Sequence, residues 1–192
     1  PTSDKIGLGG ITSGSAGYAG VWDGTIWDTE GAKLFQVSGA SGHNVAANYE
    51  FGCADLAWQY NSGELWVAYG GGLNVYISEY DNSGTWTTSQ SFTLITGARD
   101  GNVLNLLLKA RRDGNTNTLM LMAVEDGGKE KLYYSEYVTS WSTGAIAETG
   151  IYKDTEKCFD GEWLGSGGYF MAFTGLPENN KLRYNVWTTA VG

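Results

Sequence analysis

Short runs of apolar and aromatic residues alternate with glycine-rich or polar turns along the whole chain. One stretch has such runs at residues 56–60, 65–69, 74–80 and 85–92, separated by Asn-Ser-Gly, Gly-Gly-Gly and Asp-Asn-Ser-Gly turns. Runs of this length and composition, bounded by glycine, predict antiparallel strands joined as hairpins. Residues 102–110 are apolar enough to be ambiguous between helix and strand, and their place in the repeat favours a strand.

An alanine between large apolar residues recurs four times, at Ala19, Ala68, Ala123 and Ala172, with separations of 49, 55 and 49 residues. A Ser-Gly pair lies upstream of three of these alanines, and an aliphatic-aromatic strand lies downstream of each. Self-similarity at this period is typical of propeller blades. We therefore expect a single all-β domain over residues 1–192, a closed four-bladed β-propeller with repeats at about 4–52, 53–99, 100–157 and 158–192.

Each repeat opens with an aspartate, and we expect these four side chains to face a central channel where the innermost strands begin. They are Asp4, Asp55, Asp100 and Asp160. Four carboxylates around one axis could hold a hard cation such as Ca²⁺. The alternative is an aspartate that caps the entry to each strand as an Asx turn, and this structural role is favoured.

Three repeats place a glutamate three residues after an aromatic residue. The residues concerned are Trp27, Glu30, Tyr76, Glu79, Tyr133 and Glu136. In an extended strand this offset puts the two side chains on opposite faces, so each carboxylate would lie beside aromatics of a neighbouring strand. That combination suits a sugar, which stacks on the ring and donates hydroxyls to the carboxylate. Alternatively, each glutamate ends a strand and satisfies a turn amide. The fourth repeat has Val186 instead, so we expect at most three sugar sites.

The charge of the chain and its cysteines bear on which partners it could bind and on whether it is cytoplasmic or secreted. The net charge is −9 with a pI near 4.5, which disfavours nucleic acid and anionic membranes, and no apolar run is long enough to insert in a membrane. The two cysteines, Cys53 and Cys158, lie at equivalent places in opposite blades and are expected to be free thiols. With no N-glycosylation sequon, a cytoplasmic protein is favoured, with a secreted one as the alternative.

The order of aspartate, glycine turn, aromatic strand and second aromatic pair resembles the hemopexin repeat, over nearly the whole chain. It is carried by residues 4–27, 55–76 and 160–184, each running from the opening aspartate to an aromatic residue. The resemblance implies four blades and adds to the case for an ion in the channel. The chain departs from that family in lacking a terminal cysteine pair and in having glutamate where the third strand usually carries basic residues.

A looser resemblance concerns residues 76–86 and 133–141, which are similar to the strand-turn-Trp unit of fucose-binding fungal lectins, although no arginine repeats here. Residues 81–86 also look like a degenerate sialidase Asp-box, with Ser83 where glycine is expected. Asp-boxes are structural turns, so this similarity implies propeller topology and not activity.

The sequence offers little for catalysis. His43 is the single histidine, which leaves nucleophilic triads without a base elsewhere in the chain. The paired carboxylates fall at repeated positions, whereas an active site usually breaks the symmetry of a repeat. Arg111 and Arg112 are interpreted as a solvated hairpin tip. We therefore expect a protein that is not an enzyme.

The favoured function is a non-enzymatic carbohydrate-binding protein, a lectin, with quasi-equivalent sites repeated on the blades. Repeated weak sites on one rigid body gain avidity on a multivalent glycan surface. One alternative is a hemopexin-like module that binds one small ligand or metal in the central channel. A second is a structural or adhesion subunit. No cofactor is required, calcium in the channel is an option, and two chains could pair as a homodimer through an exposed aromatic surface.

Overall fold

A computed structural model describes residues 5–11, 17–27, 54–71, 74–81, 83–87, 90–92, 103–112, 117–125, 131–149, 159–164, 168–174 and 182–188. In these residues the chain forms thirteen strands, all paired antiparallel, in four sheets. None of the described residues belongs to a helix that could cross a membrane. The predicted all-β class is confirmed.

The strands follow one another in each sheet in chain order. The first sheet holds β1 (Ile6–Ile11) and β2 (Gly17–Trp22). The second holds β3 (Ala54–Trp58), β4 (Leu65–Gly71), β5 (Asn74–Tyr80) and β6 (Gln90–Phe92). The third holds β7 (Val103–Ala110), β8 (Leu119–Glu125), β9 (Lys131–Tyr137) and β10 (Ala145–Thr149). The fourth holds β11 (Phe159–Leu164), β12 (Gly168–Thr174) and β13 (Leu182–Thr188).

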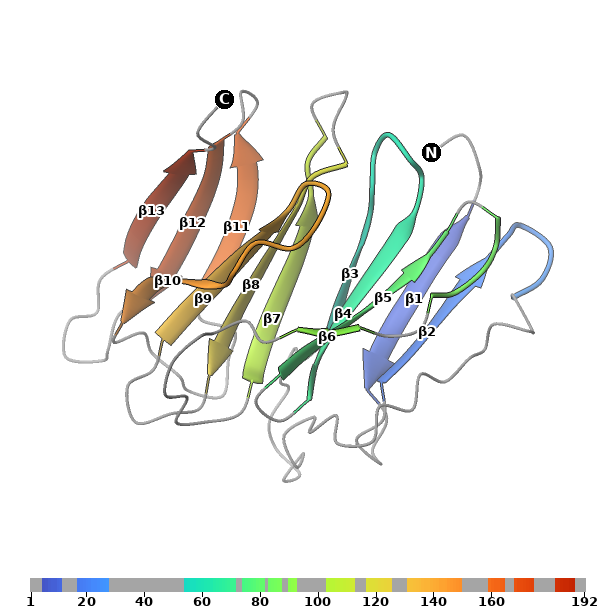
Figure 1. Cartoon of the computed structure of the whole chain (residues 1–192), viewed down its shortest axis with the longest axis horizontal. Coiled ribbons are helices and arrows are strands. Elements are labelled where there is room, and N and C mark those ends of the chain that lie inside the picture. Colours follow the sequence, from blue (N-terminus) through green and yellow to red (C-terminus); the bar gives the residue numbers. More distant parts are fainter. Residues whose placement is uncertain are drawn as a thin grey trace.

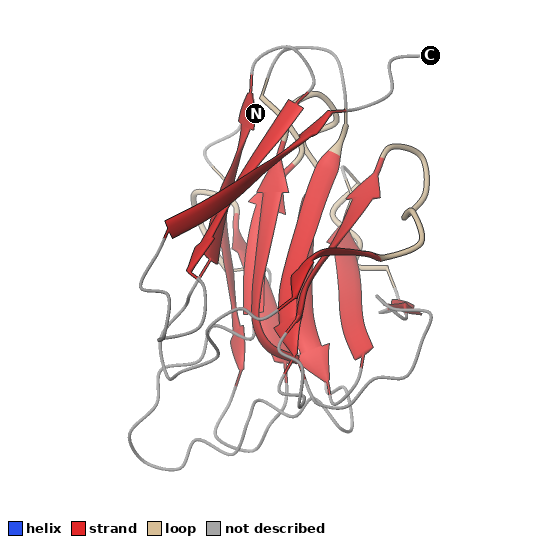
Figure 2. Cartoon of the chain, turned by 90° about the vertical axis from the view of Figure 1, so that its left-hand side faces the viewer, coloured by secondary structure: helices blue, strands red, loops and turns tan. Residues whose placement is uncertain are grey.

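The four sheets stand side by side in chain order, with the first and fourth at opposite ends of the row (Figure 1). Seen from the end of the row, strands lie one behind another (Figure 2), and buried side chains of successive sheets pack face to face. The predicted closed four-bladed propeller is not shown: among the described residues, the packed core joins each sheet to the next in chain order. We call the face of a sheet that points to the next sheet its forward face, and the opposite one its rear face.

The hydrophobic core lies in the three spaces between successive sheets. Ala19 and Val21 pack against Leu65, Val67 and Tyr69 between the first and second sheets. The space between the second and third sheets is filled from both sides by Trp66, Ala68, Ile77, Leu106, Leu108, Leu121, Ala123 and Tyr133. The space between the third and fourth holds Leu107, Met120, Met122, Val124, Tyr169, Met171 and Phe173. β7, β8 and β9 of the third sheet therefore contribute buried residues to both neighbouring spaces.

An aromatic corner repeats in three of the sheets. The last residue of β2, β5 and β9 forms an isolated bridge with a tryptophan shortly after it, in the pairs Trp22–Trp27, Tyr80–Trp86 and Tyr137–Trp141. The ring centroids of these pairs lie 5.8, 5.0 and 5.4 Å apart. In the first two corners an aspartate side chain accepts backbone N–H groups of the turn, and a glycine has a positive φ of 102° or 82°. The corners therefore mark equivalent positions.

Counting from these corners shows which residues of the repeat are structurally equivalent. The residue three places before the corner aromatic is Ala19, Ile77 or Tyr134, and its partner on the preceding strand is Gly9, Ala68 or Met122. Ala19 thus corresponds to Ile77, and Ala123 lies one residue beyond the counterpart of Ala68. The alignment of the four alanines was wrong in the first and third repeats, because period-two alternation looks the same in every strand.

The register also shows which strands each end sheet has. β1 and β2 correspond to β4 and β5, so the described residues of the first sheet include no counterpart of the innermost strand β3. In the fourth sheet, Asp160 pairs with Ala172 and Tyr184, as Asp55 pairs with Ala68 and Ile77 in the second. β11 to β13 therefore correspond to β3 to β5.

Candidate functional site

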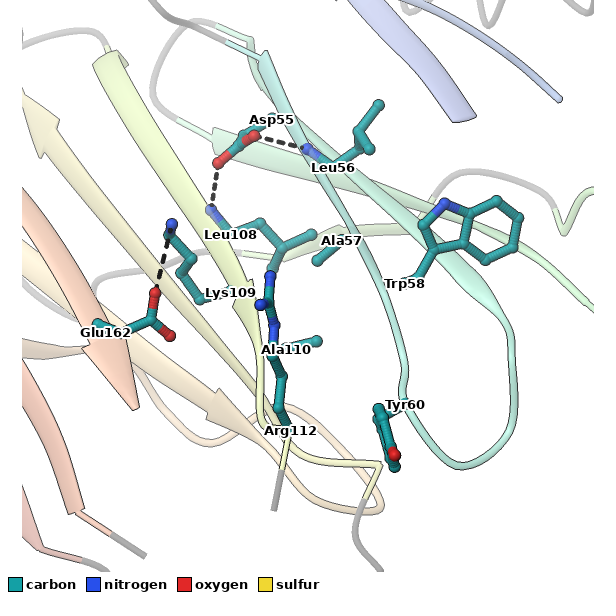
Figure 3. A pocket seen from close by; sticks show the side chains of 10 residues that line it. All are labelled: Asp55, Leu56, Ala57, Trp58, Tyr60, Leu108, Lys109, Ala110, Arg112 and Glu162. Atoms are coloured by element: carbon teal, nitrogen blue, oxygen red, sulfur yellow. Dashed lines mark hydrogen bonds and ion pairs between the residues drawn. The ribbon is translucent and has the colours of Figure 1, made fainter. Parts of the chain in front are cut away.

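A pocket of about 500 Å³ opens along β3, β7 and β11, the first strands of the second, third and fourth sheets. β3 and the turn after it, β7 and the residues after it, and β11 all contribute to its wall (Figure 3). The lining residues are Asp55, Leu56, Ala57, Trp58, Tyr60, Leu108, Lys109, Ala110, Arg112 and Glu162. A volume of this size is in the range of small-ligand sites.

Asp55 fixes the two innermost strands to each other at the pocket wall. Its Oδ1 accepts the backbone N–H of Leu56 at 2.9 Å, and its Oδ2 accepts the backbone N–H of Leu108 at 2.9 Å. The second bond joins β3 to β7, strands of different sheets that share no ladder. The Asp55 carboxylate therefore has a structural role, and it also forms part of the pocket.

Charged groups from β7 and β11 occupy one side of the pocket. Lys109 Nζ lies 3.8 Å from Glu162 Oε2. Trp163, next to Glu162, donates its indole N–H to the carbonyl of Lys109 at 3.1 Å, which holds β11 against β7. The exposed Arg112 side chain runs between this ion pair and β3 (Figure 3). The pocket therefore offers a guanidinium, an ammonium and two carboxylates to a ligand.

Aromatic side chains occupy the other side. Tyr60 is about half exposed, at 50%, and the half-buried Trp58 also packs against the core between the first and second sheets. The turn that carries Tyr60 is fixed by the buried Gln59, whose amide donates to the carbonyl of Asn117 at 2.6 Å and accepts from Ser62 Oγ at 2.7 Å. The bond to Asn117, just before β8, therefore ties the turn that carries Tyr60 to the third repeat.

The predicted sugar residues do not line this pocket. Tyr133 is only 1% exposed, and Tyr76 stacks on Tyr69 with the ring centroids 6.0 Å apart. Trp27 belongs to the aromatic corner of the first sheet and corresponds to Trp86 and Trp141 rather than to Tyr76. Glu30 lies outside the described residues. A ligand role for these residues stays a prediction, and the structure does not bring them together.

Glu79 and Glu136 lie at equivalent places on the forward faces of the second and third sheets. Burial raises the pKa of Glu79 to about 7, with help from the charge of Glu64 and a hydrogen bond to it. Burial also raises the pKa of Glu136, and the positive charge of Arg111 opposes the rise. Glu136 Oε1 is buried with no hydrogen-bond partner among the described residues. The two carboxyls lie in different spaces between sheets, so they form no shared site.

Two of the four aspartates predicted to hold calcium lie among the described residues. Asp55 and Asp160 occupy equivalent positions, and each accepts the N–H of the following residue. The equivalent place in the third sheet is Leu107, while Asp4 and Asp100 lie outside the described residues. In the part of the chain that the structure describes, no three histidine, cysteine, aspartate or glutamate residues are grouped to hold a metal. Calcium binding stays a prediction, as do the free thiols of Cys53 and Cys158, which lie outside the described residues.

Sequence reasoning missed most of the pocket. Arg112 was interpreted as a solvated hairpin tip, and Lys109 and Glu162 carried no motif. The one available signal was the repeated Asp-x-x-Trp pattern, which contains Asp55 and Trp58.

No family model matches the chain, and no curated protein sequence does. Similar solved structures include an α-L-arabinofuranosidase from Podospora anserina in complex with cellotriose and the catalytic domain of a GH62 α-L-arabinofuranosidase from Coprinopsis cinerea. Each is 12% identical with a TM-score of 0.45, over 95% of this chain and 59% of that structure. The chain thus spans less than two thirds of either one.

These comparisons correct two expectations. The similar structures are neither hemopexins nor fungal lectins, so both resemblances are withdrawn. They are enzymes, so the expectation of a non-enzymatic lectin is withdrawn as well. An identity of 12% transfers no substrate, and the functional inference has to come from the pocket of this chain.

Proposed function

We propose that the protein is carbohydrate-active and holds a saccharide in the pocket along β3, β7 and β11. The observation that carries this proposal is the combination, in one pocket, of aromatic residues with charged hydrogen-bonding groups. Sugars pack their C–H faces on aromatic rings, which Trp58 and Tyr60 supply. Their vicinal hydroxyls bind bidentate charged groups, which Arg112 and Glu162 supply.

The pocket is built differently from the repeated sites expected from the sequence. Three sheets contribute to it, and its charged residues differ from one sheet to the next: Asp55 on β3, Lys109 on β7 and Glu162 on β11. We therefore expect one saccharide per chain. The architecture that goes with this proposal is four blades, one to each sheet, in an open series.

Isothermal calorimetry against a panel of neutral and acidic oligosaccharides tests the binding. We expect a stoichiometry of one per chain, and Tyr60→Ala should weaken the affinity about tenfold because it removes the exposed ring. Val138→Ala changes an exposed apolar residue outside the pocket and should leave affinity unchanged. Absence of heat with the whole panel, or equal affinity for Tyr60→Ala, would contradict the proposal.

A second candidate is hydrolysis of the glycosidic bond. It is favoured by the two carboxylates in the pocket, Asp55 on β3 and Glu162 on β11, since most glycoside hydrolases use a pair of carboxyl groups. Glu162 is the more exposed and would exchange the proton, while Asp55 is fixed by two backbone N–H groups. Release of reducing ends from any saccharide that binds should fall at least about 100-fold in Glu162→Gln. Glu64→Gln, outside the pocket, is the control. Binding without release of reducing ends would exclude this reaction.

A further inference from the structure

The two end sheets expose large apolar side chains on the faces against which no described sheet packs. On the forward face of the fourth sheet, Leu182 is 74% and Tyr184 is 67% exposed, and the Tyr184 ring stacks on Phe170. On the rear face of the first sheet, Ile6 is 59% exposed and Leu8 is also exposed. Repeat arrays normally end in units with polar outer faces. These two ends expose large apolar side chains instead, and on the fourth sheet the exposed Asp160 and Glu162 of β11 share that face with them.

The same positions are buried wherever the chain itself supplies a neighbour. Leu182 and Tyr184 correspond to Val75 and Ile77, which the third sheet covers. Ile6 and Leu8 correspond to Leu65 and Val67, which the first sheet covers. The exposed residues are therefore of the kind that fills the spaces between sheets, and they are exposed because they lie at the ends of the row.

An aromatic contact inside the chain shows how two such faces fit. Trp66, on the forward face of the second sheet, packs on the corner of the third sheet, with its ring centroid 4.6 Å from that of Tyr137 and 6.1 Å from that of Trp141. Phe170 is the counterpart of Trp66 on the fourth sheet. The first sheet offers the counterpart of the corner as Trp22 and Trp27.

We propose that the forward face of the fourth sheet binds the rear face of the first sheet of a second copy of this chain. The second copy is the occupant because forward-on-rear packing already joins the first sheet to the second, the second to the third and the third to the fourth. Phe170 of one copy then packs against the Trp22–Trp27 corner of the next copy. Such a head-to-tail contact is heterologous, so it generates closed rings or longer chains and not a two-fold dimer.

Sedimentation velocity and light scattering over a range of protein concentrations test the contact. The mass of the wild-type protein should rise with concentration beyond that of one chain. Tyr184→Lys and Leu8→Lys, at opposite ends, should each raise the dissociation constant by about tenfold or more, because a lysine would be buried without a partner. Val138→Lys, at an exposed apolar residue in the turn after β9, should associate as the wild type does. Circular dichroism checks that every variant is folded.

Mixing the two variants distinguishes this contact from a face that pairs with itself. Each variant keeps one intact end, so Tyr184→Lys and Leu8→Lys together should form one-to-one pairs and nothing larger. A wild-type protein that stays monomeric at every concentration would overturn the proposal, and would indicate another occupant for these faces. Association as tight as that of the wild type in either single variant alone would also overturn it, because it would show a face pairing with itself or another surface.

Discussion

At the scale of single residues, the most perturbed carboxyl of the described chain is Glu79. It lies on β5, directly opposite Trp66 of β4, and faces the third sheet, with Glu64, Asp81 and Tyr137 as the nearby titratable groups. Burial and the negative charges of Glu64 and Asp81 all raise its pKa, from an ordinary 4.5 to about 7. Between pH 4.5 and about 7, the folded state therefore keeps a proton on Glu79 that the unfolded state has already released.

This difference makes stability depend on pH in a definite direction. The folded pKa is raised, so the contribution of Glu79 is fully present below pH 4.5 and is lost as the pH rises to about 7. Glu79→Gln stays neutral, so its free energy of unfolding should exceed that of the wild type above pH 7, by about 1 kcal/mol once solvent screening is allowed for.

Denaturant unfolding at several pH values measures this effect. Glu64→Gln is the companion variant, because it removes the neighbouring charge and should reduce the pH slope without abolishing it. Parallel pH profiles for the wild type and Glu79→Gln would contradict the assignment.

At the scale of strands, the repeated Asp-x-x-Trp motif has different consequences in its two copies. Asp55 and Asp160 share a ladder position, but Asp55 also accepts an N–H from β7 of the next sheet. Asp160 is exposed, and its described bond is to its own neighbour, Gly161. One sequence motif thus joins two sheets in the second repeat and lies at the open end of the row in the fourth.

Asparagine at these two positions should reveal the difference. Asp55→Asn leaves one acceptor oxygen for two N–H groups, so we expect it to lower the free energy of unfolding by about 1–3 kcal/mol. Asp160→Asn keeps its single acceptor and should cost about 0.5 kcal/mol or less. Equal losses in chemical denaturation would show that the contact between β3 and β7 contributes nothing to stability.

At the scale of the whole molecule, the fold is stabilised by the side chains packed between neighbouring sheets. A single sheet on its own would leave both of its faces exposed to water. Trp66 shows this best. It is 6% exposed and contacts the aromatic corner of the third sheet. Its counterpart at the open end, Phe170, has no such corner within the described chain.

Replacing a tryptophan by alanine should therefore lower the free energy of unfolding more between two sheets than at the exposed end of the row. Trp66→Ala should cost about 3–5 kcal/mol, the usual loss for a large buried aromatic side chain. Trp27→Ala, at the exposed end, should cost about 1 kcal/mol or less in the single chain. Thermal unfolding at low protein concentration makes the comparison, and a similar melting temperature for both variants would contradict it.

The candidate site was largely beyond prediction from the sequence. Asp55 was identified as facing the channel, and the structure places it on the pocket wall. Arg112 and Glu162 were not identified, because they come from β7 and β11 and only the packing of three sheets brings them to one pocket. Tyr133 was a sugar candidate because it is aromatic, and it is buried because both faces of the third sheet are covered.

The sequence by itself determined the strands and their grouping. Period-two alternation and glycine turns are local properties, so they predicted an all-β chain of about 50-residue units without any knowledge of its packing. Only the tertiary structure decided the rest. The alternation of apolar and polar residues does not show which face of a strand packs on which neighbouring sheet. The correspondence of strands between sheets, their order in the row and the pocket therefore all depend on contacts between sheets.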